Sequence, residues 1–127
     1  MAITNWELTA PHIELGEDSK NAVAREMKEE TRLNVKPEKL ISIVEGFFKG
    51  TDGKNFHEIS FYYLLTLNEN VETKDYENQE NDKGKLVTLK FKWIDCKDID
   101  KIDFRPDALI NKIKSQNWDF EHIISYQ

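Results

Sequence analysis

The sequence predicts an α+β fold with a mixed or antiparallel β-sheet. Two observations indicate this class: β-rich segments precede and follow one central amphipathic helix, and a second, shorter helical segment lies near the C-terminus. The chain has 127 residues, a length at which one hydrophobic core is typical. We therefore expect residues 1–127 to form a single domain.

The first two elements are an extended segment and the central helix. Residues 1–15 contain spaced apolar side chains and are interrupted by Pro11, which cannot donate to a sheet ladder and so favours an edge, bulge or turn. The helix begins after a capping residue, either Asp18 or Ser19, and runs to about Thr31.

A β-hairpin and a polar loop are predicted next. Residues 39–49 and 55–68 are rich in β-branched and aromatic side chains, and the glycine-containing turn at residues 50–53 joins them. Residues 69–85 are polar and charged, so we expect a mobile loop there.

The C-terminal part alternates between short elements. Residues 86–94 are predicted to form a strand, and residues 98–103 an acidic turn. Pro106 suits the first turn of a helix that continues to about Lys114. The tail at residues 118–126 alternates imperfectly and is a candidate strand.

Composition limits the classes of function. The net charge is −6 and the lysines are scattered, so we do not expect binding to nucleic acid. Cys96 is the only cysteine, which excludes an intramolecular disulfide and gives no support to a cysteine-based zinc site. No signal peptide and no apolar run long enough to span a membrane is present. We therefore expect a soluble, cytoplasmic protein without a membrane partner.

Three carboxylates in the predicted helix have the spacing of a metal site. Glu26, Glu29 and Glu30 are related as i, i+3 and i+4, which brings their side chains onto one helix face. Like charges this close destabilise a helix, whereas a hard divalent cation prefers such oxygen ligands. A solvated acidic face has the same spacing. Spacing alone leaves both interpretations open.

Residues 11–33 extend this pattern. They resemble the Nudix box, the signature G-x5-E-x7-R-E-U-x-E-E-x-G-U of the Nudix hydrolase family, in which U is aliphatic. Seven of the nine defined positions match at the correct spacing. These positions are filled by Glu17, Arg25, Glu26, Met27, Glu29, Glu30 and Leu33. Pro11 and Arg32 replace the two glycines, and Arg32 adds strain because glycine is the usual residue at a left-handed helix end.

The resemblance implies a fold. Nudix members form an α/β/α sandwich in which the box makes a loop–helix–loop, and they usually begin with a strand and a hairpin before the box. Here the box starts at Pro11, so the resemblance implies an N-terminally truncated version with a mixed sheet. An open sheet edge is a liability. We expect the C-terminal tail to add as a strand or two chains to pair as a homodimer.

The resemblance also implies an activity. Nudix members use Mg²⁺ or Mn²⁺ to hydrolyse a nucleoside diphosphate linked to another moiety, so the expected partner is a small phosphorylated, nucleotide-like substrate. The implied metal ligands are Glu26, Glu29 and Glu30. Glu17 would hold an outer-sphere water or a second ion.

Other residues would assist. By resemblance, Arg25 holds a glutamate in place through a bidentate contact beside the catalytic Glu26 and Glu29. Glu45 and Glu58 are the candidates for a separate general base. The alternative hypothesis, which the replaced glycines favour, is a degenerate or truncated Nudix fold that binds a nucleotide or a protein without catalysis.

Overall fold

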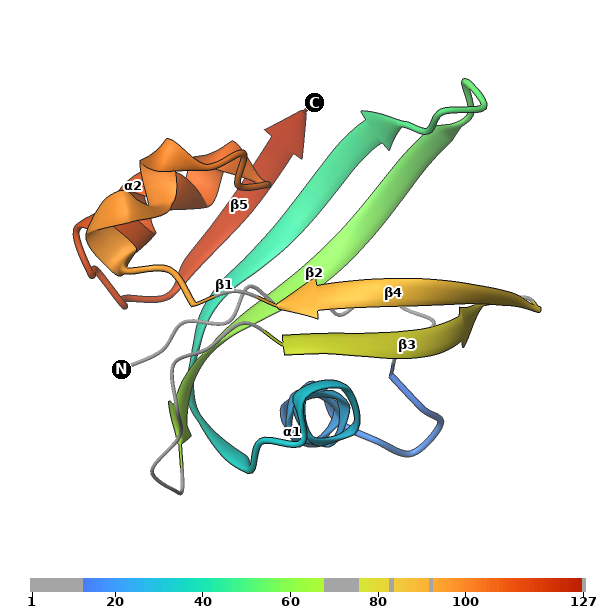
Figure 1. Cartoon of the computed structure of the whole chain (residues 1–127). Helices are drawn as coiled ribbons and strands as arrows, with labels where there is room; N and C mark the ends of the chain where they lie inside the picture. Colours follow the sequence, from blue (N-terminus) through green and yellow to red (C-terminus); the bar gives the residue numbers. More distant parts are fainter. Residues whose placement is uncertain (1–12, 68–75, 83, 92, 127) are drawn as a thin grey trace.

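The computed structural model describes residues 13–67, 76–82, 84–91 and 93–126 (Figure 1). The elements are α1 (Ser19–Thr31), β1 (Val35–Lys49), β2 (Asn55–Leu67), β3 (Tyr76–Asp82), β4 (Lys85–Phe91), the 3-10 helices η2 (Cys96–Lys101) and η3 (Asp107–Leu109), α2 (Ile110–Lys114) and β5 (Glu121–Tyr126). The extended segment expected at residues 1–15 falls mostly outside the described residues. Among the described helices, none is long and apolar enough to cross a membrane.

The sheets confirm the predicted α+β class with a mixed sheet. One sheet has the strand order β2-β1-β5, in which β2 is antiparallel and β5 parallel to β1. The other consists of the antiparallel pair β3 and β4. In Figure 1 the β3–β4 pair runs at an angle to the strands of the β1–β2 hairpin, with α1 below the pair and α2 beside β5.

Helix α1 begins and ends where the local sequence predicts. The Asp18 carboxylate accepts a hydrogen bond from the Asn21 amide at 2.7 Å, which satisfies a free N–H of the first turn. Arg32 ends the helix in the left-handed conformation, with φ at 65°, and its amide donates to the Lys28 carbonyl. The helix buries one face that includes Val23 and Met27.

The β1–β2 hairpin is confirmed, although β1 starts four residues earlier than predicted, at Val35. Pro37 is tolerated in this strand because the register with β2 shifts between Pro37 and Lys39. Alternate side chains of β2 pack into two different cores. Phe61 and Tyr63 pack with the cluster around α1, and Tyr62 packs with the cluster around α2.

The prediction of a mobile loop at residues 69–85 is wrong for its second part. Residues 76–82 form β3, which pairs with β4 along its whole length. The sequence of β3 is polar, so its hydrophobic pattern does not reveal it; its hydrogen bonds to β4 stabilise it instead. Residues 69–75 and 83 of the predicted loop lie outside the described residues.

The C-terminal segments also differ from the prediction in detail. The helix expected from Pro106 to Lys114 is divided into η3 and α2. The candidate strand at the tail is present as β5. It adds to the sheet beside β1, which is the first of the two arrangements expected from the sequence. Lys112 anchors this strand, because its buried ammonium donates to the Asp119 carbonyl.

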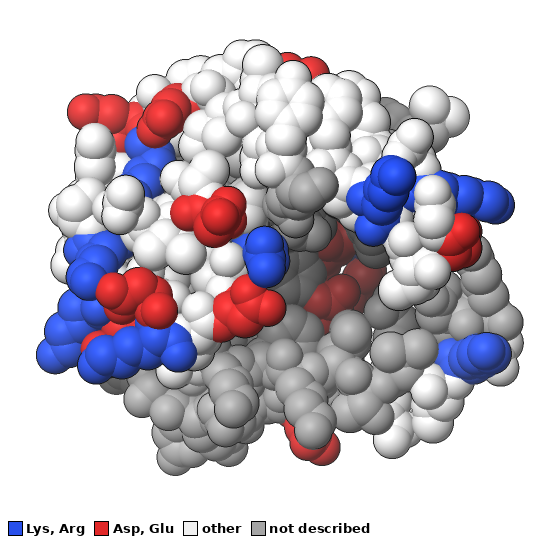
Figure 2. Space-filling view, turned by 90° about the horizontal axis from the view of Figure 1, so that it is seen from above, with Lys and Arg blue, Asp and Glu red and all other residues white. Residues whose placement is uncertain are grey.

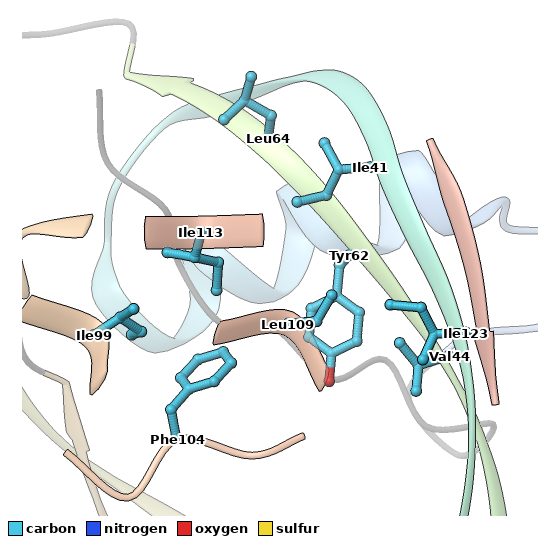
Figure 3. Packing of buried hydrophobic residues seen from close by; sticks show 9 residues of the cluster. All are labelled: Ile41, Val44, Tyr62, Leu64, Ile99, Phe104, Leu109, Ile113 and Ile123. Atoms are coloured by element: carbon cyan, nitrogen blue, oxygen red, sulfur yellow. The ribbon is translucent and has the colours of Figure 1, made fainter. Parts of the chain in front are cut away.

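The core on the α2 face draws on most of these elements. Figure 3 shows its side chains pointing toward one another from β1, β2, β5, η2, the segment before η3, and the helices η3 and α2. They are Ile41, Val44, Tyr62, Leu64, Ile99, Phe104, Leu109, Ile113 and Ile123. Because β1 and β2 contribute to this core and support α1 on their other face, the sheet fixes both helices relative to each other.

Candidate functional site

Arg25 joins the carboxylates at the start and on the exposed face of α1. Its Nε donates to Glu17 Oε2 at 2.8 Å and its Nη2 to Glu17 Oε1 at 2.9 Å. Its Nη1 donates to Glu29 Oε2 at 3.2 Å and lies 3.9 Å from Glu14 Oε1. The bidentate contact that the resemblance implied for Arg25 is therefore made with Glu17, eight residues earlier in the sequence.

The local backbone brings Glu17 to Arg25. A turn closes when the Glu17 amide donates to the Glu14 carbonyl at 3.0 Å, and Gly16 adopts a positive φ of 82° within it. The Glu17 carboxylate then accepts from the Glu14 amide at 3.2 Å in addition to Arg25. Glu17 thus fastens the loop before α1 to the helix.

These contacts shift two pKa values in opposite directions. The hydrogen bond from Arg25 lowers the pKa of Glu17 below its ordinary value. The same hydrogen bond raises the pKa of Arg25 above its ordinary value. Both groups are therefore charged at neutral pH, and the guanidinium offsets part of the negative charge that the box carboxylates place on this helix.

The three predicted metal ligands differ in exposure. Glu26 is buried, with 5% of its surface exposed, Glu30 is half-buried, and the Glu29 side chain is 61% exposed beside Arg25. Oxygen donors of this kind fit a hard divalent cation. In the part of the chain that the structure describes, however, no three histidine, cysteine or acidic side chains are already gathered at metal-binding distances. The carboxylates would have to rotate toward one another to share an ion.

The surface seen from above is consistent with a recessed acidic region. Figure 2 shows a hollow in which Asp and Glu side chains lie deep, with Lys and Arg side chains on both sides of it.

Glu45 lies on the sheet face that carries α1. It is paired in register with Ile59, which lies two residues before Phe61 on β2 and therefore shares the face that packs against the α1 cluster. Its carboxylate is 2.8 Å from His122 Nε2 on β5 and 3.5 Å from His57 Nε2 on β2. The His57 ring also stacks on Phe47, with centroids 4.2 Å apart.

Glu58 lies on the opposite face, where it lines a pocket of about 210 Å³. The pocket is lined by Val44, Gly46, Phe48, Glu58, Ser60, Tyr62, Arg105 and Pro106. The sequence did not predict this set, because it depends on the register of the hairpin and on the position of the segment before η3. One signal was present: a glycine in a strand interior often marks a site where a ligand approaches the backbone.

The two replaced glycines of the box have different outcomes. Arg32 adopts the left-handed conformation that a glycine would adopt there, so the helix end is preserved. Pro11 lies outside the described residues, and the edge, bulge or turn expected there stays a prediction.

Comparison with known domain families matches residues 2–113 of the chain to the NUDIX domain. No curated protein sequence gives a significant match. The matched region contains the whole box, the β1–β2 hairpin, the β3–β4 pair and all but the last residue of α2.

Proposed function

Because this chain belongs to the Nudix family, we propose that it is a metal-dependent hydrolase that cleaves the diphosphate bond of a nucleoside diphosphate linked to another moiety. The domain match supports a Nudix-type pyrophosphohydrolase in general terms. The observation that carries the proposal is the contact of Arg25 with both Glu17 and Glu29 beside the other box carboxylates. This arrangement fixes the acidic face and leaves it only partly neutralised.

The box residues have separate tasks in this proposal. Glu26, Glu29 and Glu30 would hold Mg²⁺ or Mn²⁺, the ions that the family generally uses. Such an ion neutralises charge on the diphosphate and increases the acidity of a bound water. Arg25 orients Glu29, and Glu17 fixes Arg25 in turn. Glu17 therefore acts on the position of other side chains, since its two oxygens already accept hydrogen bonds from Arg25.

Between the two candidates for a general base, we favour Glu45. A general base must reach the attacking water near the reacting group, and Glu45 shares a sheet face with α1, whereas Glu58 lies across the sheet. The hydrogen bond to His122 holds the Glu45 carboxylate in one orientation.

The alternative is a non-catalytic module that binds a nucleotide or a protein. Its main support in the sequence is the loss of both box glycines. Arg32 weakens that support, because it adopts φ of 65° and keeps the closing hydrogen bond to Lys28. We therefore favour the hydrolase.

Phosphate release from a panel of nucleoside diphosphate compounds and nucleoside triphosphates, with Mg²⁺ or Mn²⁺, tests the proposal. Glu30→Gln should reduce turnover by roughly two to four orders of magnitude, because a metal clamp acts on charge that develops at the phosphoryl group. The matched control is Glu38→Gln, which makes the same chemical change on an exposed residue of β1. The absence of metal-dependent hydrolysis across the panel would contradict the proposal and favour the non-catalytic module.

Metal binding has a separate readout. Mn²⁺ should raise the melting temperature of the parent chain in proportion to occupancy, and a Glu29→Gln, Glu30→Gln double variant should lose this shift. An equal shift in the double variant would place the ion elsewhere.

The remaining predictions concern assembly and location. We propose that residues 1–127 act as one domain and that the chain forms a homodimer. The substrate is a small nucleotide-like molecule, with neither nucleic acid nor membrane as a partner. A cytoplasmic location stays a prediction from the sequence.

A further inference from the structure

The pocket around Glu58 has the size and lining of a site for one planar ring system. Its volume of about 210 Å³ is below the roughly 300–1,000 Å³ of sites for drug-sized ligands. Gly46 contributes to this space, because a β-carbon added there would meet no heavy atom within 4 Å. The missing side chain thus leaves an open volume next to the backbone of β1.

Two flat groups line the pocket. Phe48 presents an aromatic ring, and Arg105 a planar guanidinium whose Nε donates to Asp103 Oδ1 at 3.1 Å. Aromatic rings and guanidinium planes are the groups on which nucleobases stack in proteins. Stacking alone does not select one base, because every base has a π-face.

Glu58 supplies the selective group. It is half-buried on β2, and no described residue forms a hydrogen bond or ion pair with its carboxylate. A carboxylate accepts two hydrogen bonds side by side and donates none. It therefore selects a ring edge that presents two adjacent N–H donors.

We propose that this pocket binds the guanine base of a nucleotide, with the two Glu58 oxygens accepting hydrogen bonds from N1–H and N2–H. Among the common bases, only guanine presents two adjacent donors on its pairing edge. Adenine and cytosine present a donor next to an acceptor, and uracil and thymine present one N–H between two acceptors. The inference rests on the proposed function for the class of ligand, a nucleotide.

The pocket and the box carboxylates lie on opposite faces of β2. Base binding and metal-dependent hydrolysis can therefore be measured independently. Guanosine monophosphate and adenosine monophosphate without metal are the probes for the pocket, since they contain no diphosphate bond to cleave. Calorimetric titration of the full chain gives the ratio of their two dissociation constants.

The parent chain should bind guanosine monophosphate at least about tenfold more tightly than adenosine monophosphate, because one bidentate contact discriminates between bases by roughly that factor. Glu58→Gln should remove the guanine preference. A carboxamide offers one acceptor and one donor, which match N6–H and N1 of adenine and equally N1–H and O6 of guanine. The control Glu38→Gln makes the same chemical change outside the pocket and should keep the guanine preference.

A second variant tests the volume directly. Gly46→Leu fills the open space without meeting protein atoms at its β-carbon, so the melting temperature should not fall while binding of both nucleotides is lost. Equal affinity for the two nucleotides in the parent chain, or unchanged guanine binding in Gly46→Leu, would overturn the proposal.

Failure of this inference and failure of the proposed function give different results. If the chain hydrolyses a diphosphate but binds the two monophosphates without a preference that depends on Glu58, the pocket assignment is overturned. The proposed hydrolase then stands. A guanine preference that is lost in Glu58→Gln, without hydrolysis of any diphosphate, supports the pocket and leaves the non-catalytic module as the function.

Discussion

At the scale of single residues, Arg25 determines the charge balance of the box helix. It contacts the carboxylates of Glu17 and Glu29 and lies near Glu14, so one cation serves three anions. The i, i+4 spacing of Arg25 and Glu29 made their contact predictable from sequence. The contact with Glu17 was not derivable from helical spacing, because it depends on the turn at Gly16 that precedes the helix.

The pair of Glu17 and Arg25 should make stability depend on pH. The pKa of Glu17 is lower in the folded state than its ordinary value of 4.5, so its contribution is fully present above that value. It is lost as the pH falls through the folded pKa. Glu17→Gln should therefore be less stable than the parent chain at neutral pH, and this difference should shrink at about pH 3.

Urea unfolding of both proteins at the two pH values checks this. An Arg25→Gln, Glu17→Gln double variant should lose no more unfolding free energy than the two single variants lose in total, because both changes remove the same interaction. A difference between parent and Glu17→Gln that stays constant with pH contradicts the assignment.

At the scale of elements, the sequence predicted those helices and strands whose ends are set by neighbouring residues. Helix α1 was predicted with its bounds because Asp18 caps it. The β3 strand was missed because its stability comes from pairing with β4. The faces of Glu45 and Glu58 depend on one register, in which Gly46 opposes Glu58, and a sequence does not reveal a register shift of one residue.

The end of α1 carries backbone strain that glycine would relieve. Arg32 has φ of 65°, a conformation that disfavours residues with a β-carbon. Arg32→Gly should stabilise the fold by about 1 kcal/mol, as measured by thermal or urea unfolding. Arg32→Ala is the matched control, since it removes the side chain and keeps the β-carbon. Equal stabilisation by both variants would assign the effect to the side chain.

The attachment of β5 depends on a buried lysine. The Lys112 side chain is 5% exposed and donates to the Asp119 carbonyl. Lys112→Met should destabilise the fold by about 1–3 kcal/mol, because it leaves that carbonyl without its donor. Amide hydrogen exchange in β5 should accelerate more than in β2. Lys114→Met is the control, because Lys114 lies on α2 like Lys112 but pairs with Asp100 at the surface. It should change stability by less than about 1 kcal/mol.

At the scale of the whole molecule, the sheet of β2, β1 and β5 separates two cores and two candidate sites. The core around α1 supports the box carboxylates, and the core around α2 supports the pocket. Both cores include side chains of β1 and β2, so loss of either should disrupt the other. This shared sheet is the physical basis for expecting residues 1–127 to unfold in one cooperative transition.

The edge of this sheet supports the prediction of a homodimer. Strand β5 has β1 on one side, and no described residue pairs with its other side. Its sequence contains neither lysine nor proline, the residues that commonly protect an edge. It also exposes Ile124 and Tyr126, at 54% and 79% of their surfaces. Two chains that pair antiparallel through β5 would extend the sheet and cover these edges.

Light scattering on a sizing column at micromolar concentration should therefore report a dimer for the parent chain. Ile124→Lys should produce a monomer, because pairing about a two-fold axis near Ile124 sets the two lysines opposite each other, and like charges directly opposite destabilise a strand pair. Ile59→Lys is the matched control: it adds the same charge to an exposed isoleucine of β2, away from the β5 edge, and should leave the dimer intact. A monomeric parent chain contradicts self-association altogether. A dimer that persists in Ile124→Lys but is lost in Ile59→Lys would instead assign the interface to the β2 side of the sheet.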